Sequence, residues 1–127
     1  MDTSIQTLTE KHLEAACAVN PEACVYVHLT LFTGHQPMLV RIWPTTYLLD
    51  QASAHRSILL HAENISFAPI WTPVPAGIRY DFLLVFSGLP AGCRIFDLVE
   101  QTEGTDGGAF VVRDINRNEN DVYRITL

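Results

Sequence analysis

Apolar and polar residues alternate with a period of two from residue 25 onward, and this pattern constrains the fold more than any other feature of the sequence. In residues 25–32, Val25, Val27 and Leu29 fall on one face and polar or aromatic residues fall on the other. Successive side chains of a β-strand point to opposite faces, so the pattern predicts a strand with one buried face. Further segments of this kind are residues 38–43, 46–49, 57–62, 78–86, 94–99, 109–115 and 122–127.

Turn-forming residues separate these segments. Residues 67–76 contain three prolines, which predict an extended crossover rather than a central strand because proline cannot donate to a β-ladder. The sequence between the strands has no helical periodicity that would cover a parallel sheet. We therefore expect an all-β protein: an antiparallel β-sandwich of seven to eight strands over residues 25–127, within a single domain of residues 1–127.

The N-terminal segment has a different pattern. Thr7 and Glu10 have the spacing of a capping box, good helix formers follow, and Asn20-Pro21 would end a helix. We predict a short helical segment within residues 1–21. An alternative interpretation makes residues 4–8 an edge strand and starts the helix near Thr9.

Composition narrows the functional classes. The chain has 127 residues, 48% of them hydrophobic, and a net charge of −6. The acidic balance argues against nucleic acid and anionic membrane surfaces as partners, because phosphate binding needs basic surface. The longest apolar runs are far shorter than the roughly 20 residues of a membrane span, so we expect a soluble protein without membrane insertion.

The beginning of the sequence and its cysteines bear on location. Residues 1–20 lack a basic region followed by an apolar one, which favours the cytoplasm unless a leader has been removed. Three cysteines, Cys17, Cys24 and Cys93, leave at least one unpaired and fit a reducing compartment. Pairing of Cys17 with Cys24 stays open.

Several motifs in the middle of the chain carry a resemblance to a known family. A strand ends in Asp50, Gly77 opens a strand that leads to Leu89-Pro90, and Phe-Asp-Leu-Val-Glu follows at residues 96–100. Over about residues 39–115 this arrangement resembles small immunoglobulin-like sandwich modules of unknown function that are common in bacteria, especially Bacteroidetes. The resemblance implies an immunoglobulin-like fold and supplies no catalytic residues.

Residues 114–121 contain the best candidate for a metal site. Asp114, Asn116 and Asn118 place oxygen ligands at every second position, as in the first half of a calcium-binding EF-hand loop. Glu119 stands where that loop needs glycine, and Ile125 stands where it needs a glutamate. An ordinary Asn- and Asp-rich turn is the simpler interpretation.

Other reactive side chains lack the partners that catalysis needs. The five histidines raise the question of a zinc site, which needs three or four ligands with local pairs among them. Cys24 and His28 are four residues apart, but in a strand they would lie about 13 Å from each other, too far to bind one ion. Cys93 precedes Arg94, a setting that could lower the pKa of its thiol. For Asp97 we expect a hydrogen bond to loop backbone or to a hydroxyl group. With no nucleophile or phosphate-binding motif recognisable, the sequence predicts no enzyme and no cofactor.

The strands also carry apolar residues on the face opposite the core. These residues predict a surface for a protein partner or for self-association as a homodimer, and the alternative is a sandwich whose second face is slightly apolar. The candidate interface residues are Tyr26, Phe32, Leu39, Trp43, Leu59, Leu83 and Val85. The sequence thus favours a non-enzymatic protein-binding or assembly module, with a small-ligand or calcium-binding sandwich that uses residues 114–121 as the alternative.

Overall fold

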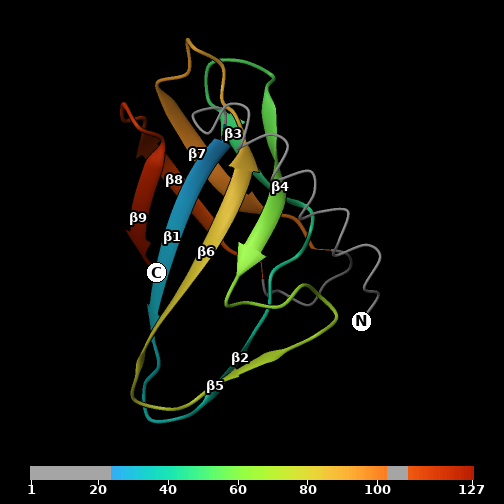
Figure 1. Ribbon diagram of the computed structural model, residues 1–127, viewed down its shortest axis with the longest axis vertical. Helices are drawn as coiled ribbons and strands as arrows, with labels where there is room; N and C mark the ends of the chain where they lie inside the picture. Colours follow the sequence, from blue (N-terminus) through green and yellow to red (C-terminus); the bar gives the residue numbers. More distant parts are fainter. Residues whose placement is uncertain (1–23, 103–108) are drawn as a thin grey trace.

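Strands make up most of the computed structural model, which describes residues 24–102 and 109–127 (Figure 1). The all-β prediction is confirmed for these residues. The predicted helical segment of residues 1–21 lies outside them. The strands are β1 (Cys24–Phe32), β2 (Met38–Val40), β3 (Thr46–Asp50), β4 (Arg56–Glu63), β5 (Thr72–Val74), β6 (Arg79–Ser87), β7 (Ile95–Glu100), β8 (Val111–Asn116) and β9 (Val122–Thr126).

Seven of these strands form one sheet in the order β8-β7-β3-β4-β6-β1-β9. β1 and β9 are parallel and the other neighbours are antiparallel, so the sheet is mixed and the prediction of a wholly antiparallel fold is wrong in this detail. The two edge strands, β8 and β9, are joined by residues 117–121 alone. Such a connection spans at most about 21 Å, whereas the edges of a flat seven-stranded sheet lie about 29 Å apart. The sheet must therefore curl.

A bulge in β4 marks the place where the sheet changes direction. β4 pairs with β3 through Arg56–Ile58 and with β6 from Leu59 onward, and its register shifts between Leu59 and His61. The extra residue changes which side chains of β4 face inward. Ser57 and Leu59 face the core before the bulge, and Ala62 faces it afterwards.

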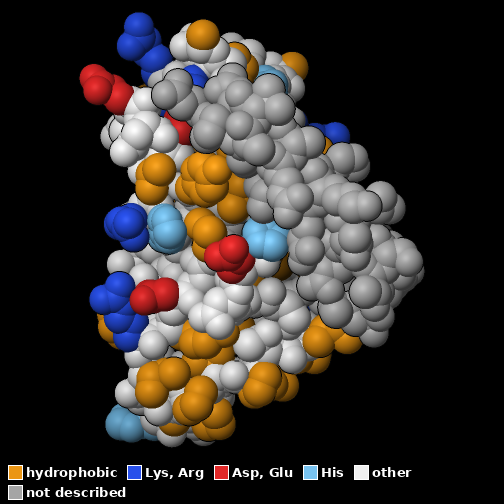
Figure 2. Space-filling model, in the orientation of Figure 1, with side chains coloured by type: hydrophobic (Ala, Val, Ile, Leu, Met, Phe, Trp, Pro, Cys, Tyr) orange, Lys and Arg blue, Asp and Glu red, His pale blue; other side chains and the backbone are white. Residues whose placement is uncertain are grey.

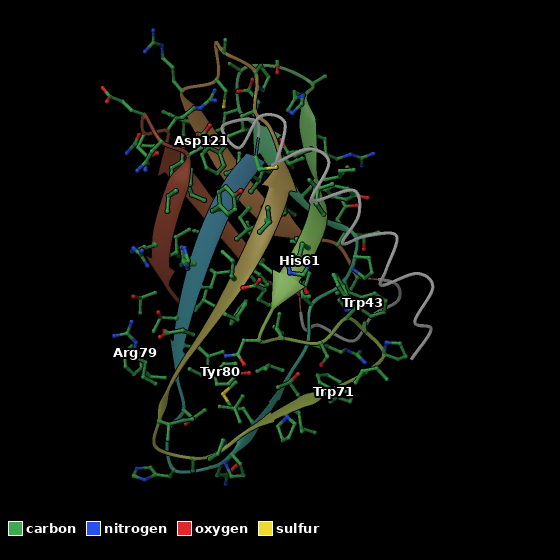
Figure 3. The ribbon with its side chains drawn as sticks, in the orientation of Figure 1. Trp43, His61, Trp71, Arg79, Tyr80 and Asp121 are labelled. Atoms are coloured by element: carbon green, nitrogen blue, oxygen red, sulfur yellow. The ribbon has the colours of Figure 1, made fainter. Side chains whose placement is uncertain are left out.

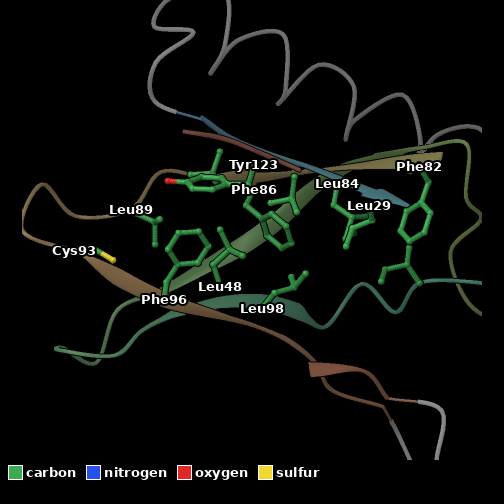
Figure 4. Packing of buried hydrophobic residues seen from close by; sticks show 13 residues of the cluster. Leu29, Leu48, Phe82, Leu84, Phe86, Leu89, Cys93, Phe96, Leu98 and Tyr123 are labelled. Atoms are coloured by element: carbon green, nitrogen blue, oxygen red, sulfur yellow. The ribbon is translucent and has the colours of Figure 1, made fainter. Parts of the chain in front are cut away.

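The hydrophobic core fills the inside of the curl (Figure 4). On β6, Phe82, Leu84 and Phe86 are buried on one face, as alternation within residues 78–86 predicts. Ile78, which alternation puts on the same face, instead lies just before the strand and is 37% exposed. Phe96 and Tyr123 pack edge to face, with ring centroids 5.0 Å apart. Residues from β1, β3, β6, β7 and β9 thus form a single core.

A two-stranded extension continues from one end of the sheet. β2 and β5 pair with each other, and Leu39 lies opposite Pro73. We call residues 33–43 and 67–78 the arm; it occupies the lower part of Figure 1. Its proline-rich half was predicted as a crossover and contains a short strand instead, because a two-stranded ladder tolerates a proline at an edge position.

Candidate functional site

The end of the sheet opposite the arm is held together by a polar network. Arg117 donates to both carboxylate oxygens of Asp121, from Nε at 3.1 Å and from Nη2 at 3.0 Å, and to the carbonyl oxygen of Pro90. The Tyr123 hydroxyl donates to Asp121 at 2.8 Å, and burial, the largest cause, raises the pKa of this tyrosine to about 12. This network ties the β8–β9 turn to the β6–β7 corner, and we call it the closed end.

The proposed cation ligands belong to this region and mostly serve as structural hydrogen-bond acceptors. The Asn118 side-chain oxygen accepts from the N–H of Asp121 at 2.8 Å, and Asp114 accepts from Gln51 at 2.7 Å. Asp114 and Asn116 lie in β8 rather than in a loop. Among the described residues no three His, Cys, Asp or Glu side chains are grouped to hold a metal ion. The turn interpretation accounts for Asn118, and calcium binding stays a prediction.

Asp97 has the structural role expected of it. Its Oδ1 accepts from the backbone N–H of Asp114 and from Gln51 Nε2, both at 2.9 Å. The N–H of Asp114 is the largest cause of a pKa below the usual value of an aspartate. Its backbone partner is confirmed, although that partner belongs to a strand and not to a loop.

The cysteines differ from the sequence-based expectation. Cys93 is free and buried, and its pKa rises to about 11, first because of burial and then because of Asp50. The expected lowering of this pKa is therefore wrong. Cys24 is disulfide-bonded. The question of its pairing with Cys17 involves a residue outside the described range.

A pocket of about 340 Å³ lies at the other end of the sheet, between the arm and the sheet itself. Leu31 of β1 and Phe82 of β6 line its inner wall, and Phe110 and Leu127 extend this wall on the side of β8 and β9. From the arm come Met38, Leu39, Val40, Arg41, Trp43 and Trp71. Figure 2 shows hydrophobic side chains gathered at this end of the molecule, and Figure 3 shows Trp43 and Trp71 on the arm.

Arg41 stacks between the two tryptophans of the pocket wall. Its guanidinium carbon lies 3.8 Å from the ring centroid of Trp71 and 5.2 Å from that of Trp43. Its Nη1 also lies within hydrogen-bonding distance, 3.4 Å, of the Pro69 carbonyl oxygen. Such cation–π contacts contribute about 0.5–2 kcal/mol each and hold the two segments of the arm together.

Glu100 is the buried acid of the pocket and is only 4% exposed. Its Oε2 accepts from the N–H of Trp43 at 3.1 Å. Burial is the largest cause of its raised pKa, and hydrogen bonds from the backbone of Trp43 and Phe110 and the charge of Arg41 oppose this shift. Sequence reasoning did not single out Glu100. The sequence signal that could have identified it is its position on the same face of the strand as the apolar residues Phe96 and Leu98.

The predicted interface residues are not all surface residues. Phe32 is 62% and Leu39 is 60% exposed, and Tyr26, Trp43 and Leu83 are half-buried. Leu59, beside the β4 bulge, packs against the core. Val85 is 1% exposed and is in register with Tyr26 on β1 and His61 on β4. That the seven residues form an interface stays a prediction.

Additional exposed apolar residues lie on the arm. Together with Phe32 and Leu39 they form a surface that we call the apolar end, which consists of Phe32, Met38, Leu39, Ile70, Trp71 and Ile78, each at least 37% exposed. Sequence reasoning missed Met38, Ile70, Trp71 and Ile78, because alternation puts Met38 and Ile78 on the core faces of the segments 38–43 and 78–86, and residues 67–76 were predicted as a crossover. Three members of the apolar end, Met38, Leu39 and Trp71, also line the pocket.

Comparisons with known proteins return no match: no family model, curated protein or solved structure is detectably similar to the chain. The resemblance to bacterial immunoglobulin-like modules stays a hypothesis. Within the described part of the chain, no helix is long and apolar enough to span a membrane.

Proposed function

We propose that the chain is a non-enzymatic protein-binding or assembly module that contacts a second copy of itself through the apolar end. The observation that carries this proposal is that six large apolar side chains, on the arm and on the adjoining end of β1, are exposed. Exposed apolar patches of this kind mark contact surfaces, and aromatic residues and Met are enriched in them.

The charge of the surface supports a second copy as the partner. A twofold interface places the same patch on both subunits, so like charges would face each other wherever the patch is charged. The six residues of the apolar end are all uncharged. Of the charged residues beside them, Arg41 is stacked on Trp43 and Trp71, and Arg79, next to Ile78, is paired with Asp81. Two copies can therefore meet here without repulsion between like charges.

The fold also supports a relation to immunoglobulin-like modules, which we propose as part of this function. Core residues come from both the β3-β7-β8 part and the β1-β6-β9 part of the curled sheet, as they would if two halves faced each other like the sheets of a sandwich. The bulged β4 joins the two halves. An experimental structure in which the halves do not face each other would contradict this relation.

The test is the molar mass of the chain in solution, measured by light scattering from low micromolar to near-millimolar concentration. We expect the mass to rise toward that of a dimer and the rise to be lost in the double variant Leu39→Ser with Ile70→Ser. The matched control replaces Ile95 and Val111, which are exposed but outside the apolar end, with serine. A monomeric wild type, or equal losses in both double variants, would overturn the proposal.

A further inference from the structure

We propose that the pocket between the arm and the sheet is a socket for one uncharged apolar side chain, aromatic or branched aliphatic, supplied by a second copy of this chain that covers the apolar end. This inference rests on the proposed function and deepens it. In the proposed contact, a side chain of one copy inserts into the pocket of the other copy, in addition to the contact between the two apolar ends.

The size and lining of the pocket determine the chemical class of its occupant. A cavity of about 150 Å³ with apolar walls is large enough to bind benzene, and this pocket has about 340 Å³. Its walls are mostly aromatic and aliphatic, with Phe82, Phe110 and Leu31 on the sheet side. Sites of this kind occur at the mouths of curled and closed sheets. An aromatic ring or a branched aliphatic group fits this space.

The charged groups of the pocket favour a neutral occupant. Of the described residues that line it, only Arg41 and Glu100 have charged side chains. Arg41 is stacked on two tryptophans, and Glu100 accepts the N–H of Trp43. A charged ligand would have to lose its hydration to enter a site where both charges already have partners, and this desolvation is costly.

The position of the pocket indicates that the occupant comes from a protein partner. Met38, Leu39 and Trp71 belong both to the pocket wall and to the apolar end. A second copy seated on the apolar end therefore lies over the mouth of the pocket. Anchor side chains that fill such pockets dominate the binding energy of many protein interfaces.

The first experiment measures occupancy of the pocket. The uncharged fluorescent probe N-phenylnaphthylamine is titrated into the full chain, whose two tryptophans both line the pocket and can transfer excitation energy to the probe. We expect saturable probe emission with a loss of tryptophan emission. Leu127→Trp, which fills the pocket from the last residue of the chain, should weaken probe binding at least tenfold. Val40→Phe is a second filling variant, in case the first is accommodated outside the pocket.

The matched control is Ile95→Trp, which adds the same side chain at an exposed position away from the pocket. It should bind the probe as the wild type does. Absence of saturable binding in the wild type, or equal binding by the control and both filling variants, would overturn the socket.

The second experiment identifies the source of the occupant. Light scattering is repeated with Leu127→Trp and with saturating probe, and both should lower self-association of the chain. If the probe binds but neither treatment changes self-association, the pocket serves a free apolar ligand; this overturns the inference and leaves the proposed function standing. If the wild type does not associate at all, the proposed function fails, and with it the partner as the source of the occupant.

Discussion

The two ends of the curled sheet differ in how the hydrophobic core is closed off from solvent. At the closed end, Asp121 accepts hydrogen bonds from Arg117 and Tyr123, and the ring of Tyr123 packs against Phe96 of the core. At the other end the core opens into a pocket, and apolar side chains of the arm remain in solvent. We therefore expect the closed end to stabilise the fold, and the open end carries the surface that we propose for binding.

Replacement of a phenylalanine by alanine at each end should give the largest difference in stability between the two ends. Phe96→Ala removes a fully buried ring that packs against Tyr123, and we expect a loss of about 4 kcal/mol in the free energy of unfolding. Phe32→Ala removes a ring that is 62% exposed, and stability should change by no more than about 0.5 kcal/mol. Urea unfolding at a concentration where the chain is monomeric measures both, and similar losses would contradict the assignment of the two ends.

The next largest difference in stability is expected between variants that break an ion pair at each end. Arg117→Met leaves Asp121 without its bidentate partner, and because both side chains are mostly buried we expect a loss of about 3 kcal/mol. The matched control is Arg79→Met, which breaks the exposed pair with Asp81 near the arm and should cost less than about 1 kcal/mol. Thermal unfolding of both variants checks this order, and a larger loss for Arg79→Met would reverse it.

Glu100 makes the stability of the open end depend on pH. Burial raises its pKa in the folded protein, so the folded state holds this proton more tightly than the unfolded state does. Stability from this group is complete below the unfolded pKa and is lost as the pH rises through the folded pKa. Glu100→Gln removes the titration and keeps an oxygen that can accept the N–H of Trp43.

The stability of Glu100→Gln relative to wild type should therefore increase as the pH rises from below 4.5, the ordinary pKa of a glutamate, toward neutrality. Denaturant unfolding over this pH range measures the difference. Glu63→Gln, an exposed substitution on β4, is the control. A difference between Glu100→Gln and wild type that stays constant with pH would show that burial does not penalise the charge.

The smallest expected effect concerns calcium. Since Asn118 and Asp114 already accept hydrogen bonds within the chain, the melting temperature should be the same with calcium and with EDTA. A ligand that binds only the folded state must raise the melting temperature. A calcium-dependent rise that is lost in Asp114→Asn would instead support the calcium-binding alternative.

The sequence predicted the strands well and their arrangement less well. Alternation located β1, β3, β6 and β9 to within one or two residues, because burial of one face imposes a period of two on the chain. The parallel pairing of β9 with β1 and the bulge at Leu59 were not predictable in this way. Both depend on how the whole sheet curls, and the bulge reverses the facing that strict alternation assigned to Leu59.

The candidate site was less accessible from sequence than the fold. Leu39 and Trp43 were predicted as interface residues and do line the pocket, but Leu31, Glu100 and Leu127 come to it from three other strands or their ends. No local spacing connects residues so far apart in the chain. Glu100, an acidic residue on the buried face of β7, was the feature of the local sequence that pointed to this site.

Hydrogen exchange measured at two protein concentrations shows which end of the molecule is covered on self-association, because it follows both ends within one molecule. At the higher concentration we expect slower exchange of arm amides such as those of Leu39 and Trp71, and unchanged exchange at Asn118 and Asp121 in the closed end. Slower exchange at the closed end with an unchanged arm would contradict the account.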